Sequence, residues 1–172
     1  MSGRRTGRRL CASAIALAWV FAARGQSIEQ AFIKEAIRGN LAEVQLGELA
    51  AQRAESDEVR KLGETVRVDH HAALQRATNL AKSLKVEPPS EPTTEAEGFY
   101  DGLAQLSGAQ FDAAFVSYMI TAHEAEIATY SRVANSNDDA VAAMIADTLP
   151  KLRSHLAAAQ ALQRGEREHA GH

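Results

Sequence analysis

Two glutamates stand at equivalent positions in the two halves of the sequence, each where a helical pattern calls for an apolar residue. Residues 32–44 and 115–127 share an aromatic–aliphatic pair, an isoleucine and an Ala-Glu-Val or Ala-Glu-Ile segment at identical spacing. The two acidic residues are Glu43 and Glu126. A carboxylate inside an apolar stripe loses its hydration and must be protonated, paired or coordinated. The repeat therefore indicates a duplicated helical hairpin, each copy carrying a buried carboxylate.

Imidazoles accompany both glutamates. A histidine segment follows in each half, at residues 70–74 and 155–159, and His123 lies one helical turn before Glu126. Carboxylates and imidazoles converging from four helices form an oxygen and nitrogen ligand set that iron, zinc, manganese, copper or nickel accepts. A divalent transition metal is thus the candidate cofactor, and its candidate ligands are Glu43, Asp69, His70, His123, Glu126 and His155.

Taken singly, these residues also have simpler explanations. Glu43 could pair with Arg67 or accept a hydrogen bond from a histidine, and His155 could satisfy a buried polar contact. His71 could simply face water. In that case the polar residues of the stripe would satisfy each other and fix the register of the helices without any ion.

Four long helices must position these side chains. Apolar residues recur at alternating spacings of four and three, which predicts helices over 28–54, 57–84, 109–134 and 139–164. A proline-rich segment at 87–92 cannot continue a helix, and a short helix over 94–106 follows it. Ser107 and Gln110 are spaced as a capping box for the third long helix. Tight hairpins joined by a long crossover predict an all-α, ferritin-like four-helix bundle.

The level of each side chain along its hairpin follows from its distance to the turn. Glu43 and His70 lie about equally far from the first turn, so an antiparallel pair places them side by side. In the second hairpin His155 lies further from the turn than His123 or Glu126, by at least about 7 Å at helical rise. Pro150 should kink the fourth long helix. The kink could absorb that offset, or the offset could mean that there is no shared site.

The N-terminal residues are typical of an export signal. Four arginines precede an apolar run at residues 10–23, followed by small residues, so we predict a secretory signal peptide over residues 1–25 and one bundle domain over 26–165. The run is shorter than the ~20 residues of a membrane helix, although an uncleaved anchor stays open. We expect a disordered tail over 166–172.

Removal of the signal changes the composition. The chain of 172 residues is 45% hydrophobic and 24% charged, with 19 basic and 22 acidic side chains. Five arginines leave with residues 1–25, so 14 basic against 22 acidic side chains give a net charge of −8. Such a charge argues against a nucleic-acid partner. The single cysteine, Cys11, also leaves, which excludes disulfides and thiolate chemistry.

Several segments resemble a bacterial envelope family known as domain of unknown function 4142. They are residues 32–49, Val66-Arg67-Val68-Asp69-His70, Ser107-Gly108-Ala109-Gln110-Phe111-Asp112, His123-Glu124 and residues 148–156. The resemblance spans about residues 30–162. It implies a ferritin-like four-helix fold and export to the periplasm or outer membrane, and it leaves the biochemical role open.

The comparison with ferritin-like proteins also shows a departure. Di-iron bundles use Glu-x-x-His on two helices, whereas the residues three before His70, His71 and His155 are Arg67, Val68 and Leu152. A ferroxidase or di-iron oxygenase is therefore disfavoured. The sequence also has no Gly-x-Ser-x-Gly elbow, no phosphate-binding glycine loop and no His-Glu-x-x-His helix.

Two functions remain. The main expectation is a non-enzymatic structural, interaction or stress-related module of the cell envelope, with an envelope protein or the membrane surface as its partner. The alternative is binding of a metal ion at a mononuclear Glu/His site, for sequestration or stress protection. The sequence leaves the oligomeric state open.

Overall fold

Three of the five helices in the described part of the chain begin at a side-chain hydroxyl that caps the helix. A computed structural model describes residues 27–170, with side chains to residue 165. Helix α1 spans Ile28–Arg53, α2 Asp57–Ser83, α3 Thr94–Leu103, α4 Gly108–Val133 and α5 Asp139–Ala170. The hydroxyls of Ser27, Ser56 and Thr93 accept backbone N–H bonds at the starts of α1, α2 and α3. The described part of the chain is therefore all-α.

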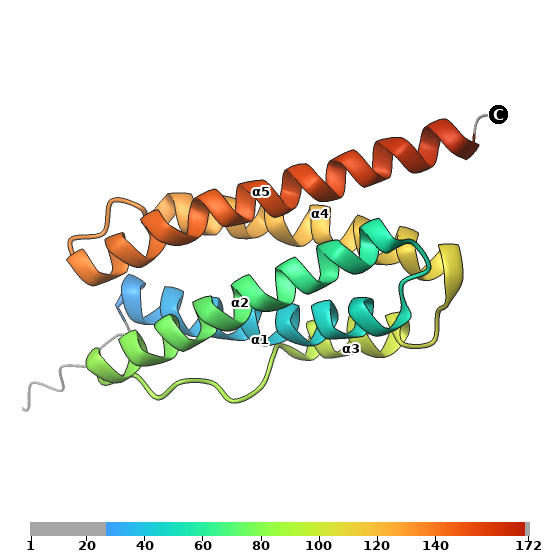
Figure 1. Cartoon of the computed structure of the whole chain (residues 1–172). Helices are drawn as coiled ribbons and strands as arrows, with labels where there is room; N and C mark the ends of the chain where they lie inside the picture. Colours follow the sequence, from blue (N-terminus) through green and yellow to red (C-terminus); the bar gives the residue numbers. More distant parts are fainter. Residues whose placement is uncertain (1–26, 171–172) are drawn as a thin grey trace, which may run out of the picture.

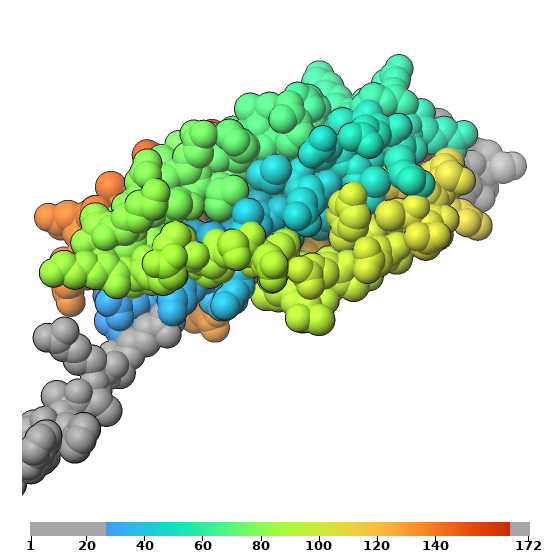
Figure 2. Space-filling view, turned by 90° about the horizontal axis from the view of Figure 1, so that it is seen from below, coloured from blue at the N-terminus to red at the C-terminus, as the bar shows by residue number. Residues whose placement is uncertain are grey.

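The long helices form two hairpins, α1 with α2 and α4 with α5 (Figure 1). Across the bundle α2 contacts α5 and α1 contacts α4, so the four helices enclose one interior. The connection between the hairpins, residues 84–107, includes α3, which contacts α1 and α4. Figure 2 shows this connection running along the outside of α1. The predicted tight hairpins and long connection are thus present, while a specifically ferritin-like arrangement stays a prediction.

The interior is apolar at both ends and polar in the middle. One hydrophobic cluster contains Phe32, Ile37, Ala77 and Ile145, and the other contains Leu46, Val66, Phe115, Met119 and Ala159. On α1, α2, α4 and α5 the chain passes from one cluster to the other through a buried polar residue. We call these residues the polar layer: Asn40, Glu43, His70, His123 and His155. Burial of apolar side chains on both sides holds the layer away from bulk water.

Two contacts fix the relative position of the helices. Asp112, which is buried near the start of α4, accepts hydrogen bonds from the backbone N–H groups of Glu55 at 3.0 Å and Ser56 at 2.8 Å. Helices α1 and α2 also approach closely, because a Cβ atom added at Gly47 would lie 2.6 Å from the carbonyl oxygen of Gly63. Glycine therefore permits the backbone approach that brings the two polar faces together.

Several details differ from the sequence predictions. Ser107 is the N-cap residue of α4, but its side chain makes no capping hydrogen bond, so the predicted capping box is wrong. Gly108 has a φ of 60°, so the backbone enters the helix through a left-handed residue. Helix α5 is continuous through Pro150 and extends to Ala170. The disorder predicted for residues 166–172 stays a prediction.

The predicted signal peptide and the end of the tail lie outside the described residues. Among the helices that are described, none combines the length and apolar character that crossing a membrane requires. The kink predicted at Pro150 stays a prediction.

Candidate metal centre

The four long helices place one or two polar side chains each at the same level of the bundle. Glu43 on α1 lies opposite His70 on α2, with Oε2 2.8 Å from Nδ1. The level predicted from the turn is therefore correct for the first hairpin. The second oxygen of Glu43, Oε1, lies 3.4 Å from Nδ1 of His123 on α4. One buried carboxylate thus joins imidazoles from both hairpins.

In the second hairpin His123 and His155 meet, although their distances from the turn predicted a separation. His123 Nε2 lies 3.1 Å from His155 Nδ1. Side chains on a helix lean toward its N-terminus. On α4 this direction leads away from the turn, and on α5 it leads back toward the turn, so the two side chains lean toward one another. The opposite directions of the two side chains compensate for the axial offset between the backbone positions of His123 and His155. Counting residues from the turn does not include this effect.

Hydrogen bonding fixes the tautomer of His123. Its Nδ1 lies 2.9 Å from the backbone carbonyl oxygen of Met119. A carbonyl oxygen can only accept, so Nδ1 carries the proton and donates it. In the neutral ring Nε2 is therefore the atom with the free lone pair, and this atom faces His155.

His70 is fixed in the same way from the first hairpin. Its Nδ1 lies 3.0 Å from Oδ1 of Asn40 as well as 2.8 Å from Glu43 Oε2. The amide of Asn40 is oriented because its Nδ2 donates to the carbonyl oxygen of Ala36 at 2.5 Å. Nδ1 of His70 thus faces two acceptors and carries the proton. Nε2 of His70 is buried and has no hydrogen-bond partner.

Asp69 holds the third imidazole. Its Oδ2 lies 3.0 Å from Nε2 of His155, and its Oδ1 accepts a hydrogen bond from Lys151 Nζ at 2.5 Å. Partial burial acts to raise the pKa of Asp69, but the hydrogen bonds from Lys151 and His155 outweigh it and lower the pKa below its ordinary value. Asp69 is thus an ionised acceptor, so Nε2 of His155 donates and Nδ1 keeps the lone pair.

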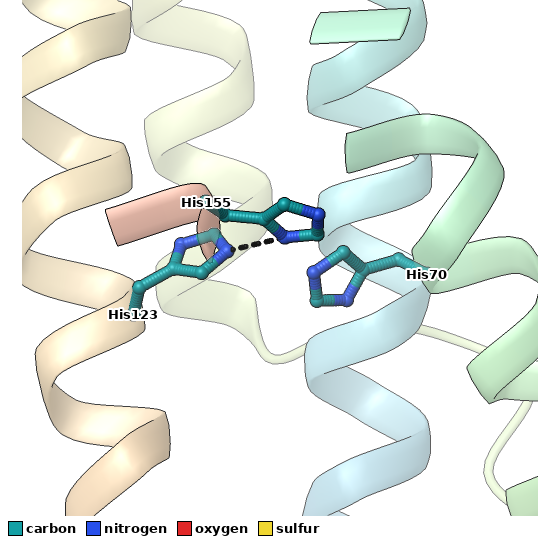
Figure 3. A group of neighbouring side chains, drawn as sticks. All are labelled: His70, His123 and His155. Carbon is teal, nitrogen blue, oxygen red and sulfur yellow. Dashed lines mark hydrogen bonds between the residues drawn. The ribbon is translucent and has the colours of Figure 1, made fainter. Parts of the chain in front are cut away.

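The three rings converge on one small volume. Their centroids are separated by 5.2, 5.4 and 5.5 Å. One ring nitrogen from each of His70, His123 and His155 can be chosen so that all three lie within 4.8 Å of one another. Figure 3 shows the hydrogen-bonding contact between His123 and His155 and a nitrogen of His70 turned toward this pair. All three side chains are buried. The group has the separation that one metal ion with three nitrogen ligands requires.

Burial also keeps the rings neutral. It is the largest influence on each of the three imidazoles and lowers the pKa of His70, His123 and His155 below the ordinary value. A neutral imidazole offers a lone pair, whereas an imidazolium does not. A hydrogen bond between His123 and His155 would require a proton on one of two nitrogens that otherwise both bear lone pairs. Burial opposes the positive charge that this extra proton would bring, and a cation bound by both lone pairs would take the place of the proton.

A second carboxylate adjoins the imidazoles. Oxygens of Glu43 and Glu126 lie with nitrogens of His70 and His123 in a group whose atoms are all within 4.8 Å. Burial raises the pKa of Glu126 well above its ordinary value, and the nearby charge of Glu43 raises it further. Burial also raises the pKa of Glu43, although the electrostatic interaction with His123 partly offsets the effect. Oε2 of Glu126 is buried without a hydrogen-bond partner.

Glu126 and Glu43 are not equivalent in the structure, although their sequence positions match. Glu43 lies inside the polar layer, and Glu126 lies at the inner side of a cleft between α1 and α4. The buried face of α4 passes through His123 and Tyr130, not through Glu126. Gly39 on α1 leaves room for Glu126, because a Cβ atom at residue 39 would lie 2.8 Å from Glu126 Oε1.

All six residues proposed from the sequence therefore lie in one connected group, but with different roles. Asp69 is not within the ligand groups and instead orients His155. Two contributors were missed, Asn40 and Lys151. Asn40 lies one turn before Glu43, and Lys151 lies one turn before His155, so helical spacing alone could have identified both as neighbours.

The simpler explanations are resolved residue by residue. Glu43 contacts histidines, whereas Arg67 pairs with Glu64 on its own helix. His71 is exposed, as the alternative reading expected.

Comparison with known proteins agrees with the fold. A family model described as "Domain of unknown function (DUF4142)" matches residues 18–162. No curated protein matches the chain by sequence.

Three solved structures illustrate the similarity in fold. A DUF305 fragment from Deinococcus radiodurans is 15% identical, with a TM-score of 0.71 over 78% of this chain and 94% of the fragment. CopM in the Cu(I)-bound form is 19% identical, with a TM-score of 0.69 over 81% of this chain and 98% of CopM. A candidate secreted DUF305 protein from Streptomyces coelicolor is 14% identical, with a TM-score of 0.69 over 81% and 95% of the two chains.

Proposed function

The chain belongs to the DUF4142 family, and we propose that it binds one transition-metal ion through His70, His123 and His155. One observation supports this most strongly. One ring nitrogen of each imidazole faces an oxygen acceptor, and one nitrogen of each ring lies within 4.8 Å of the nitrogens of the other two. Metal-ligating histidines in proteins are held in this way, by a carboxylate or carbonyl on the far ring nitrogen. Here the acceptors are Asn40 for His70, the carbonyl of Met119 for His123 and Asp69 for His155.

Copper is the ion we propose. Imidazole nitrogen suits copper, zinc, iron and nickel, and among divalent ions copper binds such ligands most strongly. CopM, which has the same fold, is known in Cu(I)-bound, Cu(II)-bound and Ag-bound forms. Three neutral nitrogens accept Cu(I), and the carboxylate of Glu126 adds an oxygen ligand that suits Cu(II). The one cysteine of the sequence, Cys11, lies in the predicted signal peptide, so thiolate ligands are not part of the proposed site.

The biological role that fits such a site is sequestration of the ion or protection from metal stress outside the cytoplasm. The predicted signal peptide and the similarity to a candidate secreted DUF305 protein support export. A buried ion that is enclosed on most sides is held away from reactants, which suits storage better than turnover. The absence of Glu-x-x-His at the imidazoles disfavours a di-iron ferroxidase.

A structural or interaction module of the envelope is the second candidate. The contacts from Lys151 through Asp69 to His155 favour it, because these residues satisfy one another without an ion. In that case the polar layer would specify the register of the four helices. His70 is not accommodated by this explanation, since its Nε2 stays unpartnered.

Metal analysis of matched histidine variants separates the two candidates. His70 is buried in the polar layer, and His71 is the next residue and exposed. Chain expressed without a histidine tag should contain or take up one copper ion, His71→Ala should behave identically, and His70→Ala should lose the ion. Circular dichroism checks that both variants are folded. Wild-type protein that takes up no copper or zinc, and whose melting temperature neither ion changes, would overturn the proposal in favour of the structural module.

A further inference from the structure

The imidazoles are buried, so an ion needs a route to them, and the structure offers one open side. A cleft of about 240 Å³ lies between α1 and α4 beside the beginning of α3. Its lining includes Arg38, Gly39, Tyr118, Ala125 and both buried glutamates. We propose that this cleft is the port through which the ion enters and leaves, and that Glu126 is the protein ligand that passes the ion between the cleft and the three histidines. The inference rests on the proposed metal binding.

The opposite side of the imidazoles is closed by an ion pair. Asp69 is 27% exposed at its side chain, so the surface is near, but both of its oxygens are engaged. Lys151 donates to Oδ1, and His155 donates to Oδ2. A cation that approached from this side would meet the positive charge of Lys151 and would have to break the contact that orients His155. Entry of a metal ion past the Asp69–Lys151 ion pair is therefore unfavourable.

The charges of the cleft favour a cation. Glu35, Glu43 and Glu126 line it, and its one basic residue among the described lining, Arg38, donates to Glu35 at 2.9 Å. The lining thus holds more acidic than basic groups, and ionised acids inside a cleft of low dielectric attract cations more strongly than on an open surface. Glu126 is partly exposed as a residue, whereas Glu43 is 2% exposed.

Space at Gly39 supports the role of Glu126. The missing Cβ atom leaves the Glu126 carboxylate room beside α1, and a Cβ there would approach Oε1 to 2.8 Å. Oε2 of the same carboxylate is buried without a hydrogen-bond partner, and a Glu126 oxygen lies within 4.8 Å of nitrogens of His70 and His123. One carboxylate therefore adjoins both the cleft and the imidazoles, which is the placement that a transfer ligand needs.

Blocking the cleft without touching a ligand tests the port. Ala125 is exposed at the rim on α4, and Ala128 is exposed on the same helix outside the cleft. In stopped-flow loading of the metal-free full chain with Cu(II), Ala125→Trp should slow binding at least about tenfold. Ala128→Trp, which carries the same bulk, should load at the wild-type rate. Chelator-driven release from Ala125→Trp should slow by the same factor, so the equilibrium affinity should stay unchanged.

Two further variants complete the test. Glu126→Gln keeps the shape of the side chain, removes its acidic group and should also slow loading, while Glu124→Gln, at an exposed residue of α4 outside the cleft, should leave the loading rate unchanged. Equal loading rates for Ala125→Trp and Ala128→Trp, or for Glu126→Gln and Glu124→Gln, would overturn the port while leaving metal binding intact. Wild-type protein that binds no copper would instead overturn the proposed function, and the port with it.

Discussion

Replacing Gly39 by alanine should separate the stability of the bundle from its capacity to bind metal. Alanine in a helix interior is favoured over glycine by about 1 kcal/mol. The new Cβ atom would lie 2.8 Å from Oε1 of Glu126 but 4.0 Å from its Cδ, so the carboxylate must move. It is the end of a flexible side chain that borders the cleft, and it can turn outward. We therefore expect metal-free Gly39→Ala to be between 0 and about 1 kcal/mol more stable than wild type.

Two other glycines calibrate that expectation. A Cβ atom at Gly98 would meet nothing within 4 Å, so Gly98→Ala should gain the full ~1 kcal/mol. A Cβ atom at Gly47 would lie 2.6 Å from the carbonyl oxygen of Gly63 and 2.9 Å from the backbone nitrogen of Arg67. Backbone cannot yield as a side chain can, so Gly47→Ala should lose about 1–3 kcal/mol through overpacking.

Urea unfolding of the three metal-free variants measures these differences as shifts in midpoint at constant m-value. Copper titration of the same samples should show weaker binding for Gly39→Ala, because Glu126 is displaced, and unchanged binding for Gly98→Ala. Destabilisation of Gly39→Ala as large as that of Gly47→Ala would show that the Glu126 side chain cannot turn away from the new Cβ atom. Wild-type copper affinity in Gly39→Ala would show that Glu126 does not contribute to copper binding.

Three further predictions concern the residues around the centre. Asp69→Ala removes the acceptor that orients His155 and should weaken copper binding about 10–100-fold, measured by competition with a chelator. Burial raises the pKa of Glu126 above its ordinary 4.5, so the folded chain binds the carboxyl proton of Glu126 more tightly than the unfolded chain does. The stability that this proton contributes is present below about pH 4.5 and is lost as the pH rises through the pKa of the folded state. Metal-free Glu126→Gln should thus melt near the wild-type temperature at pH 4 and above it at pH 8, whereas an equal shift at both would contradict the assignment. Asp112→Ala leaves two backbone N–H groups at the start of α2 without their acceptor and should cost about 1–3 kcal/mol with no change in copper affinity.

Helical periodicity was sufficient for the elements and for most of the centre. The four long helices begin within one residue of their predicted starts, because residues such as Ser56 and Asp138 are clear N-terminal signals. The stripe on α5 through Val141, Ile145, Leu152 and His155 is buried as predicted. Counting residues from the first turn also placed Glu43 beside His70 correctly. These features depend on the local sequence pattern, so they can be predicted from a single sequence.

Features that depend on side-chain direction or on contacts between hairpins were not predictable in the same way. The meeting of His123 and His155 depends on the opposite lean of side chains on antiparallel helices. The roles of Asp69 and Asn40 as acceptors depend on which ring nitrogen faces which neighbour, which spacing does not specify. The different environments of Glu43 and Glu126 arise because Glu43 is 2% exposed, whereas Glu126 is partly exposed at the cleft that both residues line. The internal repeat conceals this asymmetry.

The central claim is that three neutral imidazole nitrogens form one ion-binding centre, and elemental analysis of untagged protein loaded with Cu(II) and then desalted tests it most directly. One copper per wild-type and His71→Ala chain, with none in His70→Ala, His123→Ala and His155→Ala, is the result we predict. Equal copper content in His70→Ala and His71→Ala, or no copper in folded wild-type protein, would contradict it.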